Sequence, residues 1–430
     1  MLRALFVLSL TLAGACLALK GPFHALLYYI WNAYFRPEEW VWGDTRDLIL
    51  ALNASFWAGV LVVLSTVLGR TKFLFNPHIA LLFMFAAHAA LSAELSTYSE
   101  YSWFFCGDFL RAVIITYLIV VLTDDRWKLR ALMLMMVFSL GFEGAKQGWA
   151  QLVTEPGGRN DNSFPFLGDN NGVAVGMFML VPLLGALAKT TSGRWLRRLL
   201  RFVLFGVLYR GISTYSRGGF LAAGVLAIVY WLRSRNKLAV LAGIVLVAGV
   251  LLPVMPEAFW ERMQTIRTYS EIEEGSALSR LHFWKVATVM ASDNPVFGVG
   301  FHAFNPAYNE YDFSFGKYGA GRSVHSSWFG VLAELGYVGS ILYGLLIALA
   351  LRNCHVARKL SAGDPDRSDL VAYAIAFETS FWVFLVGGSF LPFQYNEMVL
   401  HLIGLSIALR YIAVRRDPVA DGPKSHDLRR

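Results

Sequence analysis

Charged side chains are scarce in this sequence. Asp, Glu, Lys and Arg make up 16% of its 430 residues, whereas soluble domains carry about 25%. Cysteine is rarer still: Cys16, Cys106 and Cys354 are odd in number, lie in or beside apolar runs, and lack ligand-like spacing. These absences argue against a disulfide framework and against a zinc site. Hydrophobic residues make up 56% of the chain, so the number of soluble domains cannot be inferred from its length.

The sequence also lacks the patterns of nucleotide and nucleic-acid binding. The formal net charge is +8, but Lys and Arg fall in short clusters between apolar runs, without a patch of interleaved aromatics. There is no Gly-rich loop ending in Lys-Ser or Lys-Thr, and no acidic metal-binding pair in the longest polar segment. We expect no nucleic acid partner, no cofactor and no metal.

Long apolar runs predict an all-α, polytopic integral membrane protein. A helix that crosses a bilayer needs about 17 to 25 mostly apolar residues, and the chain supplies about twelve such runs. The predicted spans are 2–19, 47–68, 77–95, 103–122, 129–153, 172–187, 195–213, 218–231, 238–254, 326–351, 370–390 and 398–414. The apolar run 22–35 is short for a span, so it is either a span or a re-entrant segment or one that lies at the membrane surface, and this choice is left open. The first run resembles a secretory signal, but an uncleaved helix is favoured because many spans follow.

The basic clusters predict the orientation, because Lys and Arg are enriched in short cytoplasmic loops. We place in the cytoplasm the clustered loops at 70–72, 126–130, 189–198, 233–237 and 352–359. The long polar segment then faces the periplasm. The resulting division is transmembrane helices in 1–255, a large periplasmic loop with short helices in 256–324, transmembrane helices in 325–414, and a disordered cytoplasmic tail in 415–430.

Arg217 stands in the stretch Ser216-Arg217-Gly218-Gly219, at the predicted outer mouth of a helix hairpin. The two glycines let another group approach the backbone closely, and a guanidinium suits a phosphate oxygen. The alternative is a long side chain that anchors a helix end at the membrane surface.

Arg280 lies in the long outer segment, after the acidic residues Glu271, Glu273 and Glu274. A guanidinium offers a planar fork that pairs bidentately with phosphate, which Lys cannot reproduce. The alternative is an ion pair with those glutamates.

His325 opens a long predicted helix, in the stretch Arg322-Ser323-Val324-His325-Ser326. An imidazole that titrates near neutral pH can take a proton from an attacking sugar hydroxyl. The alternative is a helix cap or an interface residue. His325, Arg217 and Arg280 all fall on one side under an orientation chosen from other loops, and a base with two guanidiniums is what transfer from a lipid diphosphate needs.

Several further polar residues are candidate substrate ligands. Lys146 lies three residues after Glu143, and the two either neutralise each other or bring Lys146 to the diphosphate. Arg210, near the outer end of its helix, is either a ligand or an anchor. Asp169 and Asn171 either cap the next helix or bind sugar hydroxyls. Arg322, in the histidine stretch, completes the set.

These residues match a known family. His325-Ser326, followed after nine residues by Gly336 and then by Gly339, resembles the histidine motif of bacterial O-antigen ligases, and Arg217 followed by Leu221 is similar to their arginine motif. The stretches 142–171 and 263–284 look more like the exosortase-associated O-glycosylation ligases of the same superfamily. The resemblance covers roughly 129–339.

The resemblance implies transfer of a whole glycan from undecaprenyl diphosphate to an acceptor on the periplasmic side of the bacterial inner membrane. It also implies a metal-independent, inverting mechanism, with His325 as base and Arg217 and Arg280 holding the diphosphate. Lipid A–core oligosaccharide is the favoured acceptor, protein the second, and another lipid-linked chain, as in a polymerase, the third. A lipid or glycan transporter is the alternative from a different class, because a many-helix bundle with buried charges also suits transport.

Overall fold

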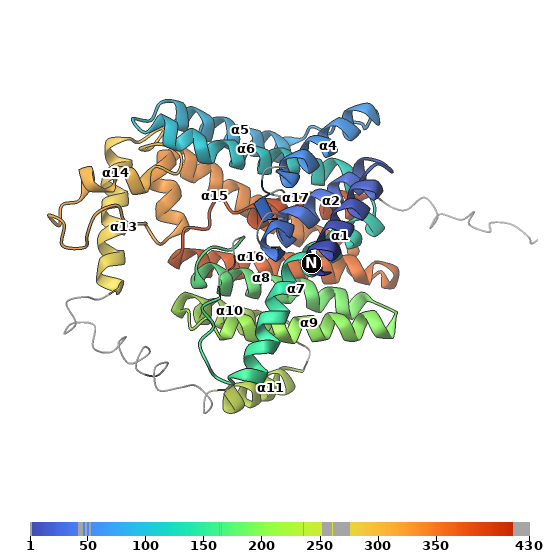
Figure 1. Cartoon of the computed structure of the whole chain (residues 1–430). Helices are drawn as coiled ribbons and strands as arrows, with labels where there is room; N and C mark the ends of the chain where they lie inside the picture. Colours follow the sequence, from blue (N-terminus) through green and yellow to red (C-terminus); the bar gives the residue numbers. More distant parts are fainter. Residues whose placement is uncertain are drawn as a thin grey trace, which may run out of the picture.

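The computed structural model describes residues 2–41, 46–47, 50, 53–162, 164, 166–234, 236–251, 260 and 276–415. Over these residues the chain is a bundle of helices joined by loops (Figure 1). The predicted tail from 416 onward lies outside the described residues, as do Glu271, Glu273 and Glu274.

The helices that build the bundle are α1 (Leu2–Ala18), α2 (Pro22–Phe35), η1 (Pro37–Trp40), α4 (Ala54–Leu68), α5 (Pro77–Glu94), α6 (Ser99–Leu122), α7 (Arg126–Thr154), α8 (Asn170–Thr190), α9 (Arg194–Ile212), α10 (Arg217–Arg233), α11 (Lys237–Leu251), α13 (Ser276–Asp293), α14 (Phe304–Tyr311), α15 (Ser327–Ser361), η3 (Pro365–Arg367), α16 (Ser368–Gly387), η4 (Gly388–Phe390) and α17 (Glu397–Val414).

The chain is a polytopic helical membrane protein, as its apolar runs predicted. Among the described residues, six helical stretches are long and apolar enough to cross a membrane: α5, α6, α8, α15, Pro365–Phe390 and α17. Three other helices do not meet this criterion. α1 and α4 are too short, with 17 and 15 residues, and α9 carries several basic side chains. The count of about twelve spans stays a prediction.

The short apolar run 22–35 forms α2, which packs inside the bundle along α7. Near the start of α2, the Phe23 ring lies 5.5 Å from the Trp127 ring, and near its end the Phe35 ring lies 6.3 Å from the Phe142 ring. Because Trp127 and Phe142 are fifteen residues apart on one helix, α2 follows α7 for about 22 Å. The surface-lying alternative for this run therefore does not describe α2.

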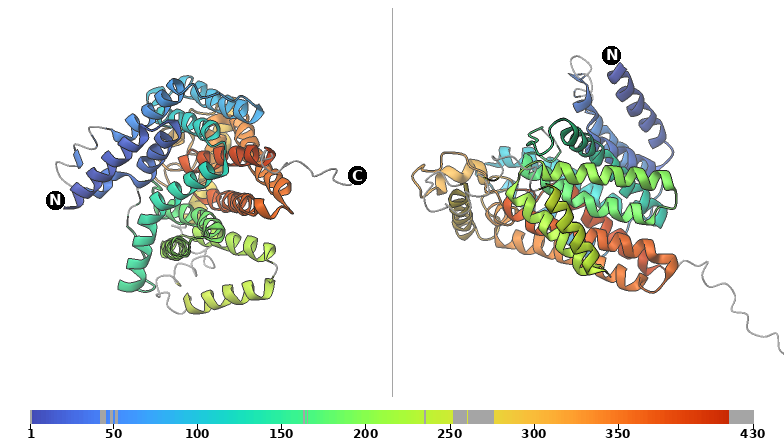
Figure 2. Two further views of the ribbon diagram at one scale, coloured as in Figure 1. Left: turned by 90° about the vertical axis from the view of Figure 1, so that its right-hand side faces the viewer. Right: turned by 90° about the horizontal axis from the view of Figure 1, so that it is seen from below.

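Three helices, α8, α10 and α15, begin at one end of the bundle, and their last turns hold Lys189, Arg233 and Arg358. We call the two ends the His325 end and the basic end. α13 and α14 lie beyond the rest of the bundle at the His325 end (Figures 1 and 2). Near the basic end, Arg233 pairs with Glu378 of α16 at 2.6 Å.

α13 and α14 share a small hydrophobic core with α15. Phe283 and Met290 of α13 and Tyr308 of α14 are buried against one another and against Ala333 of α15. The same segment is fastened by His282, whose Nε2 lies 2.7 Å from Asp312 Oδ1. This packing holds α13 against the start of α15.

α15 bends at Gly336, a residue of the predicted histidine motif. Its φ of +66° lies in the left-handed region that favours glycine. Tyr337 N donates to Pro295 O at 2.9 Å, and a Cβ at Gly336 would lie 2.6 Å from the same oxygen. The glycine thus lets the loop after α13 approach the α15 backbone.

Candidate active site

His325 lies just before α15, in a turn that α13 holds in place. Its φ of +48° is left-handed, and Ser326, not His325, caps the helix by accepting from Phe329 N. Trp284 Nε1 donates to Val324 O at 3.2 Å, and the Trp284 ring stacks on Phe329 at 5.1 Å. The helix-cap alternative for His325 is therefore excluded. The imidazole is half-buried, and its ring centroid lies 6.3 Å from that of Phe283 on α13.

The surroundings of His325 favour a neutral imidazole. Burial is the main cause that lowers the pKa of His325 below its usual value of 6.5. The positive charges of Arg280 and Arg322 lower the pKa further, whereas the Asp169 carboxylate opposes them. At neutral pH the side chain is therefore unprotonated and able to accept a proton. The same interactions show that these four side chains share one electrostatic environment.

Arg280 lies one helical turn before Trp284 on α13. Residues four apart share a helix face, so Arg280 lies on the side of α13 that contacts Val324. Its side chain is half-buried. The ion pair weighed from the sequence involves glutamates outside the described residues.

Arg322 is exposed and lies three residues before His325. Its Nε donates to the Tyr318 carbonyl. Arg322 and Arg280 thus place two positive charges near His325, one on an exposed side chain and one on a half-buried side chain of α13.

Asp169 caps α8, as one of the two sequence alternatives predicted, whereas Asn171 lies in the first turn of α8 and bonds two side chains. Asp169 Oδ1 accepts from Gly172 N at 2.9 Å, and its Oδ2 accepts from Asn171 Nδ2 at 3.0 Å. Asn171 Oδ1 in turn accepts from Ser216 Oγ at 2.7 Å. Because Ser216 caps α10, these bonds place Arg217, the first residue of α10, beside the start of α8.

The starts of α10 and α15 meet at η4. A Cβ at Gly218 would lie 2.9 Å from Phe390 Cβ, and Trp328 Nε1 donates to Ser389 Oγ at 3.1 Å. The two glycines after Arg217 therefore admit close neighbours, as expected; for Gly218 the neighbour is Phe390, and for Gly219 it is the Ala174 side chain.

Three long helices, α8, α10 and α15, consequently direct their N-termini toward the same region. Helix N-termini carry unsatisfied N–H groups and a partial positive charge, which favour anions. With Arg217 and Arg280 at the same end of the bundle, the region is suited to a multiply charged anion such as a diphosphate.

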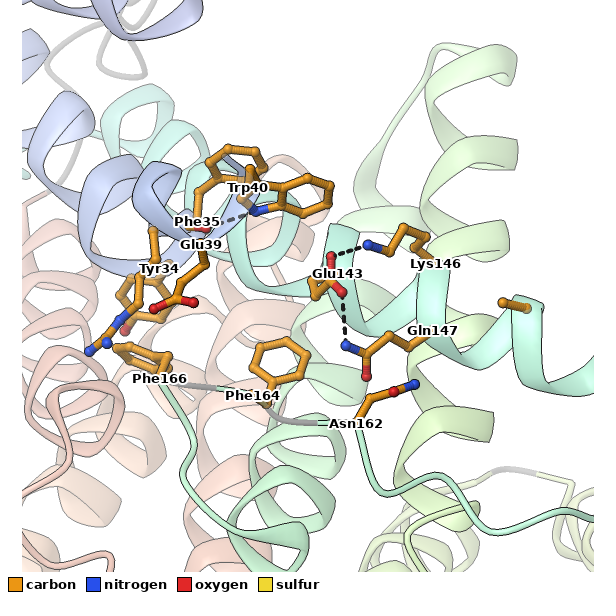
Figure 3. A pocket seen from close by; sticks show the side chains of 12 residues that line it. Tyr34, Phe35, Glu39, Trp40, Glu143, Lys146, Gln147, Asn162, Phe164 and Phe166 are labelled. Atoms are coloured by element: carbon orange, nitrogen blue, oxygen red, sulfur yellow. Dashed lines mark hydrogen bonds and ion pairs between the residues drawn. The ribbon is translucent and has the colours of Figure 1, made fainter. Parts of the chain in front are cut away.

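Lys146 and Arg210 lie in a separate network along α7. Lys146 Nζ pairs with Glu143 Oε2 at 2.7 Å and lies 4.2 Å from the Trp40 ring centroid. Glu143 Oε1 accepts from Gln147 Nε2 at 2.8 Å, and Gln147 Oε1 accepts from Arg210 Nε at 2.6 Å. Figure 3 shows Glu143 between Lys146 and Gln147 at a cavity of about 400 Å3. The mutual neutralisation of Glu143 and Lys146 is the arrangement observed.

Arg210 is fully buried and anchors the loop between α7 and α8. Besides Gln147, its guanidinium donates to the carbonyls of Asn160 at 3.3 Å and Asn162 at 2.9 Å. This loop ends at Asp169. Arg210 therefore has the contacts of an anchor that positions the cap of α8, and a direct role in substrate binding stays a prediction.

Sequence reasoning missed the residues that connect these segments. Trp284 and Ser389 contact the start of α15 and Phe390 contacts the start of α10, while Glu397 and Gln394 line a neighbouring cavity. Glu397 carried a signal, because it is an acidic residue at the start of an apolar helix. The others are common residues in apolar surroundings, and only the fold shows what they contact.

Two known families match separate parts of the chain. Residues 202–344 match the family described as O-Antigen ligase. Residues 2–182 match a family of unknown function. Among curated proteins the comparison finds no match. The first match contains Arg217, Arg280, Arg322 and His325, and the second contains Lys146, Asp169 and Asn171.

Proposed function

We propose that this chain, a member of the O-antigen ligase superfamily, transfers a glycan from undecaprenyl diphosphate to lipid A–core oligosaccharide. One observation carries the proposal. His325 is held outside the helix it precedes, within the electrostatic environment of Arg280, Arg322 and Asp169, at the end of the bundle where α8, α10 and α15 begin.

In the proposed reaction His325 is the general base. It takes the proton of an acceptor hydroxyl as that oxygen attacks the anomeric carbon of the donor. A new carbon–oxygen bond forms while the bond from the anomeric carbon to the diphosphate breaks, and the electron pair leaves on the diphosphate. Attack opposite the leaving group inverts the anomeric centre. Because Arg280 and Arg322 disfavour a charged imidazole, the proton then passes readily to water.

Arg217 and Arg280 stabilise the leaving diphosphate. Each guanidinium can donate two parallel hydrogen bonds to phosphate oxygens, and the N-termini of α8 and α10 add partial positive charge. These groups supply the charge stabilisation that the departing anion requires, so the proposed reaction uses no metal.

The basic clusters support an orientation with the His325 end in the periplasm. α8, α10 and α15 all end in basic residues, which are enriched on the cytoplasmic side. The proposed location is therefore the bacterial inner membrane, with the lipid-linked donor entering from the bilayer and the active site facing the periplasm.

The test is transfer by the purified full-length chain in lipid nanodiscs. The donor is an undecaprenyl-diphosphate glycan, and separate reactions contain lipid A–core, an acceptor protein, or a second lipid-linked glycan. The proposal expects a new glycosidic bond on lipid A–core. Product in another reaction instead assigns the O-glycosylation or polymerase activity, and movement of donor between leaflets without a new bond would support the transporter alternative.

A further inference from the structure

A cavity of about 550 Å3 adjoins the candidate active site. It extends from Gly168, which directly precedes Asp169, to Glu397 at the start of α17, and Arg36 also lines it. We call it the aromatic cavity. Its volume lies in the range of about 300 to 1,000 Å3 that ligand sites usually have. The cavity is thus large enough for a ligand that contacts Gly168, in the loop that ends at Asp169.

The wall of this cavity is fastened to the start of α15. Ser327 Oγ accepts from Phe393 N at 2.9 Å and donates to Leu391 O at 2.8 Å. Ser327 is two residues after His325, so an occupant of the cavity contacts a segment that is hydrogen-bonded to the helix start beside the base.

Aromatic rings form much of the cavity lining: Phe105, Phe109, Phe166, Phe301, Phe393 and Tyr395. Several of them pack against one another, with Phe301 and Tyr395 at 4.3 Å and Phe105 stacked on His302 at 4.0 Å between ring centroids. Such a lining offers flat apolar surfaces of fixed orientation.

Three buried oxygens in the lining have no hydrogen-bond partner among the described residues: Gln394 Oε1, Glu397 Oε2 and Tyr395 Oη. The first two are amide and carboxylate acceptors, whereas a phenol hydroxyl can also donate. Gln394 is 3% exposed. Its Nε2 donates a hydrogen bond to Glu334 Oε2 at 3.3 Å, whereas its Oε1 accepts none. A buried acceptor without a donor costs about 1 to 3 kcal/mol. The Gln394 and Glu397 oxygens are covered by protein, so these two side chains must turn toward the cavity before the hydroxyl donors of a ligand satisfy them.

The neighbouring cavity of about 580 Å3 has a different lining. It shares Arg36, Asp108 and Glu397 with the aromatic cavity, but its other wall is aliphatic, formed by Val60, Val63, Leu64, Ile114 and Ile115. Aliphatic walls suit a lipid chain. Flat rings beside unmet acceptors suit a sugar, which has an apolar C–H face and a rim of hydroxyls.

We propose that the aromatic cavity is a sugar subsite, which holds one or more residues of a glycan substrate against its rings while Gln394 and Glu397 accept hydroxyl hydrogen bonds. The inference rests on the proposed glycan transfer and adds a binding site formed outside the segment matched to O-antigen ligases, apart from Phe301 and His302.

Direct binding tests the subsite without requiring turnover. The probes are free oligosaccharides with the structures of the donor glycan and of the acceptor core, measured separately by saturation-transfer NMR on the full-length protein in nanodiscs. Phe105→Leu removes one aromatic face and Glu397→Gln replaces one acceptor oxygen by an amide donor. His355→Ala, an exposed change on the last part of α15, is the matched control. Thermal unfolding checks each variant, and Phe105→Leu carries the test alone if Glu397→Gln does not fold.

The subsite predicts that one of the two oligosaccharides binds and that its Kd rises at least about fivefold in both folded variants, with the control unchanged. The probe that responds identifies the source, donor or acceptor. Unchanged binding in both variants, or binding of neither probe, overturns the subsite even if transfer is observed. Loss of binding in the variants together with failure of every transfer reaction would retain the subsite and reject the proposed function.

Discussion

Asn171 and Ser216 form a hydrogen bond of 2.7 Å that joins the first turns of α8 and α10. Asn171 also donates to Asp169, whose charge acts on His325, and Ser216 directly precedes Arg217. One short chain of polar contacts therefore connects the cation proposed for the leaving group with the surroundings of the proposed base. This connection crosses the boundary between the two family matches.

The Asn171–Ser216 bond predicts a coupled loss of function. Asn171→Ala and Ser216→Ala should each lower kcat/KM at least about fivefold, because each removes the shared hydrogen bond, worth about 1 kcal/mol, and a second bond of its own, to Asp169 or from Gly219. The double variant should cost about 1 kcal/mol less than the sum of the two single changes, because the shared bond is lost only once, and a double-mutant cycle on kcat/KM measures this difference. Fully additive losses would show that the two residues act separately.

Replacing either guanidinium by an ammonium should impair turnover. Arg217→Lys and Arg280→Lys keep the charge but lose the planar fork, so we expect kcat/KM to fall about ten- to hundredfold for each. Arg201→Lys, at an exposed position on α9, is the control and should leave kcat/KM unchanged. Normal rates in both site variants would remove them from diphosphate binding.

The acid limb of the pH–rate profile should report His325. The base works only when neutral, so kcat/KM should fall as the pH drops through its pKa, and the lowered pKa places that midpoint below 6.5. Arg280→Gln should raise the midpoint toward 6.5, because one repelling charge is lost, whereas Arg280→Lys should leave it nearly in place. A midpoint that ignores the charge at position 280 contradicts the assigned environment.

Arg210 should affect stability more than substrate affinity. Arg210→Met leaves Gln147 and the carbonyls of Asn160 and Asn162 without their buried donor, which we expect to cost at least about 2 kcal/mol of unfolding free energy. Faster limited proteolysis of the loop before Asp169 should accompany this loss. If stability is kept and only the donor KM rises, Arg210 binds substrate instead.

Much of the bundle was predictable because apolar runs and basic clusters carry strong local signals. The cap at Asp169 and the pair of Glu143 with Lys146 were also readable, since both depend on residues two to four positions apart. The role of the 22–35 run was not, because 14 residues are too few to decide between a surface helix and a packed one. Contacts with Trp127 and Phe142 decide it.

The candidate site was predictable as a set of residue types and not as an arrangement. The pattern around His325 indicated a base, but its exclusion from the helix depends on Trp284, which lies forty residues earlier. Likewise, the sequence around Arg210 fits a substrate ligand and a structural anchor equally well. Only its hydrogen bonds to the carbonyls of Asn160 and Asn162, about fifty residues earlier, favour the anchor. The aromatic cavity is lined by residues from five parts of the chain, so no local motif indicates it.

The most direct test of the central claim is the rate of glycan transfer by His325→Ala compared with His355→Ala, each purified in nanodiscs with lipid-linked donor and lipid A–core. Loss of a general base should reduce the rate about 10²- to 10⁴-fold in the first variant, while the second, on α15 near the basic end, should match the unaltered protein. Transfer by His325→Ala at the unaltered rate would contradict the account.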